Sequence, residues 1–244
     1  MKIKHLLCFI ALCLSFTPGK AQQLSVMTLR NGATVYIWED KSKPDVFGMI
    51  AFKVGSVDDP EQYTGLAHYL EHVMFKGTQT IDALDWEKEK PIYEKIITKY
   101  DERAALSDPA AREAVDKEIN DLTREAAQYA AGNEFSLLVD HMGGQGLNAS
   151  TGYDQTEYHN SFPPSQLEKW LEIYSERLID PVFRGFQTEL EAVYEEYNMY
   201  NDDRGSRMRE FIYEQAFGDH PYARPIIGLP EHLKNPQLSK LIDF

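Results

Sequence analysis

Residues 65–78, GLAHYLEHVMFKGT, are the stretch that decides the fold and the chemistry of this chain. Apolar side chains recur in it at helical spacing, which predicts a helix; they are Leu66, Leu70, Val73 and Met74. His68 and His72 are about one turn apart, so both imidazoles project from one face and can reach one zinc ion. Glu71 lies on the same side, where it can take a proton from water held by that metal. The alternative is a surface helix that carries these three residues by chance.

Residues 1–21 differ from the rest of the chain in a way that is typical of a secretory signal peptide. A basic start leads into an apolar run, residues 6–16, which is too short to span a bilayer. Small residues close the segment, and we predict cleavage after Ala21 and a periplasmic location. The alternative is a membrane anchor, but we expect no stable one. The mature domain is then residues 22–244.

The composition excludes several classes of protein. Of the 244 residues, 43% are hydrophobic and 26% are charged, which is typical of a globular chain with one domain or two small ones. A formal net charge of −14 makes nucleic acid a poor partner. Cys8 and Cys13 both fall in the predicted signal peptide. Any zinc site in the mature chain must therefore be built from His, Asp and Glu.

The segments around the predicted metal-binding helix indicate an α+β fold. Asn31-Gly32 lies between two β-rich runs and predicts a hairpin, with a third strand at residues 46–54. Two more antiparallel strands are expected at residues 146–152 and 156–162. We therefore expect an antiparallel-rich sheet with helices packed on one face, the metal-binding helix among them.

Residues 79–132 interrupt this pattern with two amphipathic helices. Ser107-Asp108-Pro109 indicates where the second helix begins, because it offers a capping acceptor and proline is favoured in a first turn. Apolar residues from Ala111 onwards repeat at heptad-like spacing. The segment is predicted to be an inserted helical hairpin, either a solvated insertion or a docking arm or wall beside the active site.

A later helix, which begins near Phe186, carries two acidic residues on its buried side. Glu189 and Glu196 are two turns apart on one face, close to apolar residues, whereas Glu191 and Glu195 point elsewhere. A carboxylate on a half-buried face needs a reason, and zinc would be one. The other helices are predicted at residues 134–142, 165–180 and 236–244. His141, His159 and His220 are interpreted as structural.

With these segments placed, the chain resembles the M16 metallopeptidases, the family of insulin-degrading enzyme and the β-subunit of the mitochondrial processing peptidase. The resemblance covers most of residues 24–240 and rests on the motifs that follow. They are Val54-Gly55-Ser56 with Asp59, the Gly65–Thr78 stretch, Asn148-Ala149, Glu189-x(6)-Glu196 and His220-Pro221.

The resemblance implies a role for each matching residue. His68, His72 and Glu196 would bind one zinc ion and Glu71 would be the catalytic base. Glu189 would support the site from behind the ligands. Asn148 and Ala149 match the edge strand that pairs with substrate backbone. The implied function is a zinc endopeptidase that hydrolyses peptides or small unfolded proteins.

The chain departs from the family in two places. The helical insertion makes the distance from His72 to Glu196 longer than usual, as in secreted bacterial members. Family proteins also continue into a second, homologous half, so a C-terminal half or a partner subunit is expected to complete this one. The alternative function is a non-catalytic or incomplete subunit that binds peptides or scaffolds a partner chain.

Overall fold

The computed structural model describes residues 24–244, so the predicted signal peptide lies outside the described part. The chain divides at Pro44 into two compact units. In the first, β1 (Leu24–Thr28) pairs antiparallel with β2 (Thr34–Trp38). Gly32 has a φ of 88°, a backbone conformation that glycine adopts without strain. The hairpin predicted from Asn31-Gly32 is thus confirmed.

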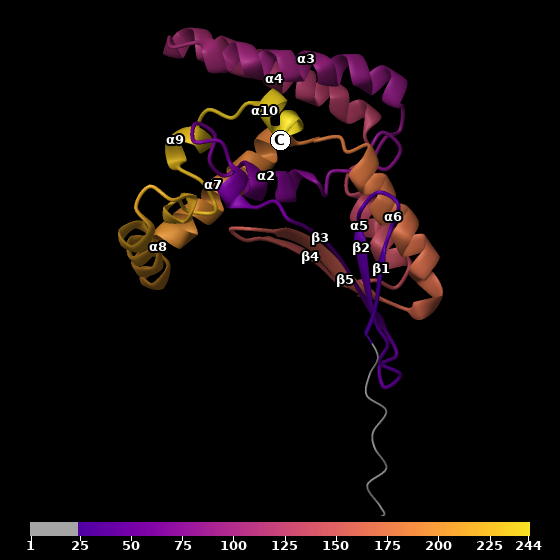
Figure 1. The fold of residues 1–244 in the computed structure, drawn as a ribbon. Coiled ribbons are helices and arrows are strands. Elements are labelled where there is room, and N and C mark those ends of the chain that lie inside the picture. Colours follow the sequence, from indigo (N-terminus) through magenta and orange to yellow (C-terminus); the bar gives the residue numbers. More distant parts are fainter. Residues whose placement is uncertain (1–23) are drawn as a thin grey trace, which may run out of the picture. The chain divides into compact units, whose positions relative to one another are not determined.

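A three-stranded antiparallel sheet lies at the centre of the second unit (Figure 1). Its order is β3 (Val46–Phe52), β5 (Thr156–Phe162) and β4 (Gln145–Thr151). Alternate residues of β5 are buried, as a sheet with one covered face requires. Asn160 on that face is fully buried. A polar side chain tolerates this burial because its Oδ1 accepts hydrogen bonds of 2.7 Å from Trp170 and Tyr174.

Helices cover the buried face of this sheet, which confirms the predicted α+β fold (Figure 1). The helices described here are α2 (Leu66–Val73), α3 (Trp86–Ala105), α4 (Pro109–Ala126), α5 (Glu134–His141), α6 (Leu167–Ile179), α7 (Phe186–Asp202), α8 (Arg204–Phe217), α9 (Pro230–Leu233) and α10 (Leu238–Asp243). The metal-binding helix α2 packs against β4 and β5, as expected. It ends at Val73, earlier than predicted, and the chain then turns at Gly77, whose φ is 89°.

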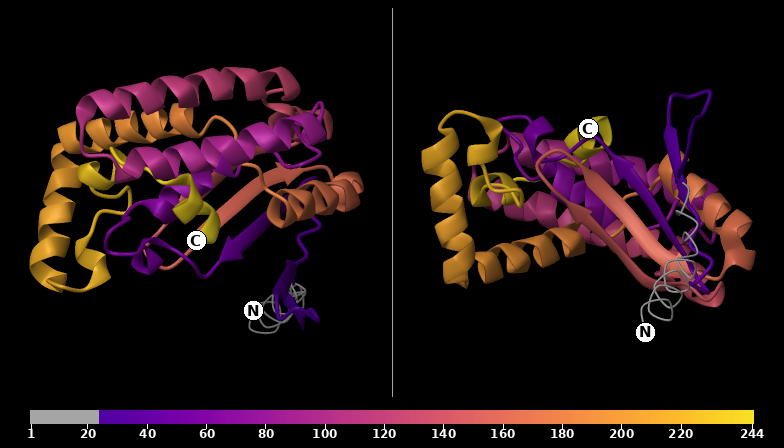
Figure 2. Two further views of the ribbon diagram at one scale, coloured as in Figure 1. Left: turned by 90° about the horizontal axis from the view of Figure 1, so that it is seen from above. Right: turned by 60° about the horizontal axis from the view of Figure 1, so that its bottom comes forward.

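The helical hairpin predicted within residues 79–132 consists of α3 and α4, which lie side by side (Figure 2). Asp108 caps α4 by accepting a 3.0 Å hydrogen bond from the Ala111 amide, and Pro109 is the first helical residue. The two helices share an apolar seam of buried residues, namely Ile92, Ile96, Tyr100, Val115 and Ile119. The pair is also packed on the rest of the unit, since the Tyr100 ring lies edge-on to Phe186 at the start of α7.

Two helices near the C-terminal end were not predicted. The larger is α8, which turns sharply away from α7 (Figure 2). Its N-cap is Asp203, whose side chain accepts a hydrogen bond from the Ser206 amide. Ser206 is its only buried residue, and the apolar residues that recur in it at helical spacing, Met208, Phe211 and Ile212, are more than half exposed. The short α9 precedes α10, which starts two residues later than expected. None of the helices within residues 24–244 is long and apolar enough to cross a membrane.

Candidate metal centre

The start of α2 is held in place by a buried carboxylate and a close backbone contact. The two oxygens of Asp59 accept hydrogen bonds of 2.7 and 2.9 Å from the amides of Gly65 and Ala67. Gly65 has a φ of 89°, and a Cβ there would lie 2.6 Å from the Ile227 carbonyl. The helix that carries the histidines therefore begins at a position fixed on two sides.

His68 and His72 lie on one face of α2, with ring centroids 4.8 Å apart, and both face Glu196 on α7. Glu196 Oε2 is 3.7 Å from His68 Nε2 and 3.5 Å from His72 Nε2. These separations are long for hydrogen bonds. They match the spacing of metal ligands, because atoms bound to a tetrahedral zinc lie about 3.4 Å apart. The three residues thus form a ligand set that could hold a metal ion.

Glu189 and Lys76 support this set from behind His72. Glu189 Oε2 is 3.6 Å from His72 Nδ1, and its Oε1 is 2.5 Å from Lys76 Nζ. A carboxylate on the second ring nitrogen orients a histidine ligand and fixes its tautomer. The side chain that the sequence placed on the buried side of α7 therefore contacts a ligand directly, while Glu191 and Glu195 are exposed as predicted.

The two histidines sit in opposite electrostatic environments. Burial, with a smaller effect of nearby His72, lowers the pKa of His68 to about 4, so its ring is neutral and ready to bind a metal. Burial also acts to lower the pKa of His72, but Glu189 and Glu196 outweigh it and raise that pKa to about 9. Metal binding at His72 therefore has to displace a proton.

Glu71 lies beside the ligand set and contacts the sheet. Its Oε2 accepts a 2.5 Å hydrogen bond from the Thr151 hydroxyl at the end of β4. Burial raises the pKa of Glu71, and the Thr151 hydrogen bond opposes that shift. A carboxylate with a raised pKa and one fixed oxygen is suited to accept and return a proton.

A cleft of 440 Å³ opens in front of these residues and is lined by His68, Glu71 and Glu196. The edge strand β4 forms one wall through residues 149–151, and α8 forms another through Arg209 and Tyr213. Ala149 lines the cleft, whereas Asn148 is exposed and is paired with His159 of β5. The cleft is thus bounded by a strand with an open edge, which is the geometry that takes an extended peptide.

The residues predicted from the sequence therefore come together, with additions. Sequence reasoning gave no role to Thr151, Lys76 or the α8 wall, and Lys76 appeared only as a member of the Gly65–Thr78 motif. His141, at the end of α5, and His159, in β5, lie outside the ligand set. His220 begins a short turn, where its Nδ1 accepts a hydrogen bond from the Tyr222 amide.

Comparisons with known proteins identify relatives of this chain. The sequence model of the family described as Insulinase (Peptidase family M16) matches residues 34–90 and 119–229. The chain is 25% identical over 193 residues to an uncharacterised zinc protease of Mycobacterium leprae. The aligned residues cover 78% of this chain and 32% of the relative. This chain is 25% identical over 222 residues to the zinc protease PqqE of Helicobacter pylori, covering 89% and 39%.

Solved structures share the fold at lower sequence identity. A protease from Helicobacter pylori superposes with a TM-score of 0.67 at 22% identity, covering 92% of this chain and 43% of that one. Pitrilysin superposes with a TM-score of 0.63 at 22% identity, covering 93% and 20%. The chain thus spans less than half the length of each of these relatives.

Proposed function

The chain belongs to the insulinase family, peptidase family M16, and we propose that it is a zinc endopeptidase of peptides or small unfolded proteins. Its zinc would be held by His68, His72 and Glu196, with Glu71 as general base. The proposal rests on one observation: three residues that could hold a metal ion lie beside the carboxylate of Glu71 at one cleft. Three protein ligands leave a fourth position open, as a catalytic rather than a structural zinc requires.

The protein's own groups would then divide the work of peptide hydrolysis. When bound, zinc supplies Lewis-acid chemistry, lowering the pKa of water and polarising a carbonyl. Glu71 takes the proton from the attacking water and passes it to the leaving amine nitrogen. Thr151 holds one oxygen of Glu71, which leaves the other oxygen to handle that proton. Glu189 keeps the ring of His72 oriented.

We propose that the substrate binds as an added strand on β4. This strand pairs with β5 on one side, so its other edge offers backbone groups to a peptide. Asn148 and Ala149 lie in this strand, and Ala149 lines the cleft. Because the edge supplies backbone hydrogen bonds, an extended or unfolded chain fits better than a folded surface.

Two further parts of the proposal concern the whole protein. We propose that a homologous C-terminal half or a partner subunit completes the cleft, since the chain spans only 32% and 39% of the two relatives. We also propose export to the periplasm through residues 1–21.

The test is the substitution Glu71→Gln, measured beside the unchanged chain. Zinc should stay bound at one ion per chain while peptide hydrolysis falls by about 10²- to 10⁴-fold, the usual contribution of a general base. Retained hydrolysis would overturn the role of Glu71. An unchanged chain that binds peptides without zinc and without cleavage would favour the alternative, a non-catalytic subunit. Activity that requires a homologous second half would support the proposed partner.

A further inference from the structure

Two segments meet behind the metal centre, and each leads to one of its helices. One is the loop of residues 76–82, which follows α2. The other is the run of residues 181–185, which leads into α7. They are joined by backbone hydrogen bonds, for example from the Val182 amide to the Gly77 carbonyl at 3.1 Å. The relative position of α2 and α7, and therefore of the three ligands, depends on this junction.

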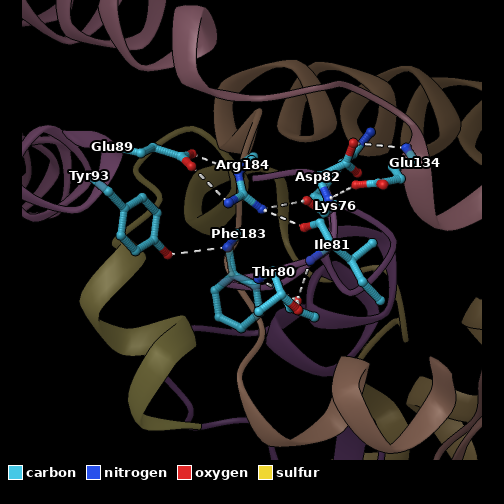
Figure 3. Close-up of polar contacts among 10 residues, drawn as sticks. Lys76, Thr80, Ile81, Asp82, Glu89, Tyr93, Glu134, Phe183 and Arg184 are labelled. Carbon is cyan, nitrogen blue, oxygen red and sulfur yellow. Dashed lines mark hydrogen bonds and ion pairs between the residues drawn. The ribbon is translucent and has the colours of Figure 1, made fainter. Parts of the chain in front are cut away.

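Arg184 is the side chain that ties the junction together (Figure 3). Its Nη1 lies 3.3 Å from the Lys76 carbonyl and 3.4 Å from the Ile81 carbonyl, both in the loop after α2. Gly185 follows it directly and is the N-cap of α7. A single guanidinium thus links the end of the histidine helix to the beginning of the glutamate helix.

The inserted hairpin supplies the counter-charge of this arginine. Glu89, in the first turns of α3, accepts hydrogen bonds of 2.6 Å from Arg184 Nε and 2.8 Å from Nη2 (Figure 3). Its side chain is 2% exposed and that of Arg184 is 11% exposed. A buried charge pair is costly unless its geometry is good and its remaining groups are bonded. Here both carboxylate oxygens and three guanidinium nitrogens have partners.

Nearby contacts place the same insertion against the same segment. Tyr93, one turn along α3 from Glu89, accepts a 3.2 Å hydrogen bond from the Phe183 amide. Asp82, at the end of the loop, exchanges hydrogen bonds of 2.6 and 2.8 Å with Glu134 of α5. The Arg184 guanidinium therefore sits in a framework fixed from α3 and α5, and a change at Glu89 is not absorbed by free movement of the loop.

The junction reaches His72 through Lys76. The carbonyl of Lys76 faces Arg184, while its ammonium bonds Glu189, whose other oxygen faces His72 Nδ1. Glu189 itself stands about one turn into α7, just beyond Gly185. Displacing Arg184 would move both ends of this path, the lysine on one side and the glutamate on the other.

We propose that Glu89 and Arg184 are positioning residues of the metal centre, and that helix α3 thereby sets the ligand geometry. This inference rests on the proposed function, because it assigns these residues to the zinc site named there. It gives the insertion a task that neither a solvated extension nor a docking arm would have.

The experiment compares zinc affinity in Glu89→Gln with that in a matched control on the same hairpin, Glu118→Gln. Glu118 forms a surface ion pair with Lys99, and its side chain is 56% exposed. Each full chain is folded, as checked by circular dichroism, and its zinc dissociation constant is measured by competition with a chelator. Cobalt is then substituted, because its visible absorption bands report the arrangement of the ligands. Glu89→Gln should weaken zinc binding about tenfold, the lower end of the loss for groups behind metal ligands, and should shift the cobalt bands. Glu118→Gln should change neither.

A second variant covers the case in which Glu89→Gln fails to fold because it leaves a buried arginine unpaired. The double substitution Glu89→Leu with Arg184→Met replaces both charges by apolar side chains of similar size, which is tolerated far better. It also removes the contacts to the Lys76 and Ile81 carbonyls, so zinc affinity should still fall. Variants with a lower melting temperature but unchanged zinc affinity and cobalt bands would overturn the inference and leave the proposed function standing. An unchanged chain that binds no zinc would overturn the proposed function itself.

Discussion

Two pairs of helices in the unit of residues 45–244, α3 with α4 and α2 with α7, bury different kinds of side chain. Between α3 and α4 the contact is apolar, with Ile119 only 2% exposed, and charged residues pair at its rim. Between α2 and α7 the contact has an apolar part, where Tyr69 packs on Phe186, and a polar part, where two histidines face two glutamates. An apolar seam stabilises a fold through volume and contact, whereas buried polar groups cost free energy unless they have partners. The first pair should therefore be sensitive to size, and the second to chemical identity.

The largest expected effect is the loss of a ligand between α2 and α7. Glu196→Gln keeps the size of the side chain but removes the charge that faces both histidines. Zinc affinity should fall by more than about 100-fold, beyond the 10- to 100-fold loss for residues that only support ligands. The loss of zinc affinity in Glu189→Gln should lie within that smaller range of about 10- to 100-fold. The measurement is zinc competition at fixed pH.

Glu195→Gln is the matched control, since Glu195 is the exposed neighbour on the same helix. It should leave zinc affinity unchanged. Equal losses for Glu195 and Glu196 would mean that net charge, rather than ligation, controls metal binding.

The α3–α4 seam should respond to volume instead. Ile119→Ala removes buried methyl groups and should cost about 2–5 kcal/mol in the free energy of unfolding. Denaturant titration measures that loss. Zinc affinity of the folded protein should not change, because the hydrogen bonds that join Arg184 to Glu89 and to the loop after α2 do not involve Ile119. A zinc affinity that tracks the stability loss would erase the distinction between the two helix pairs.

The same contrast explains what the sequence could predict. His68 and His72 were predicted to lie on one face of a helix, and they do, because that placement depends only on local helical spacing. Their role as ligands, and that of Glu71 as base, stay predictions. Glu189 and Glu196 were found as acidic residues on a buried face, and their roles came from the resemblance. The hairpin around Asn31-Gly32 and the helix start at Ser107-Asp108-Pro109 were predicted because both are signalled within a few residues.

What the sequence could not predict depends on contacts between distant segments. Glu89 looks like any acidic residue in the first turns of a helix, and its partner Arg184 lies 95 positions away. Helix α8 carries apolar residues at helical spacing, Met208, Phe211 and Ile212, but they are exposed in the fold. Their spacing therefore does not indicate that Arg209 and Tyr213 line the cleft. Likewise β3 finds its partner β5 only after the insertion, a pairing that alternation within each strand does not specify.

Asp59 offers a pH test of how buried the start of α2 is. Burial raises its pKa from 3.8 to about 6, although hydrogen bonds from the Ala67 and Gly65 amides act against the shift. The folded chain thus keeps a proton that the unfolded chain releases. Stability from this group is full below about pH 4 and is lost as the pH rises through about 6. The difference is up to about 3 kcal/mol.

The measurement is the free energy of unfolding of the metal-free chain between pH 4 and 7, compared with that of Asp59→Asn. The histidines are common to both proteins, so their titration cancels in the difference. Asparagine does not ionise, and the variant should therefore lose less stability across this range than the unchanged chain. Parallel curves would show that Asp59 titrates as an exposed carboxylate.

Asp108 performs a similar task at the start of α4, but at an exposed position where water can replace it. Asp108→Ala should therefore cost only about 1 kcal/mol of stability, the usual loss for an N-cap. Ser107→Ala, one position earlier, is the control and should cost less, because Ser107 is not the capping residue. Denaturant titration at pH 7 compares the two. Since α4 contacts neither ligand helix through this cap, zinc affinity should be the same in both variants. A drop in zinc affinity with Asp108→Ala would mean that the far end of the α3–α4 hairpin is also coupled to the metal centre. The Glu89–Arg184 pair would then be one of several such connections.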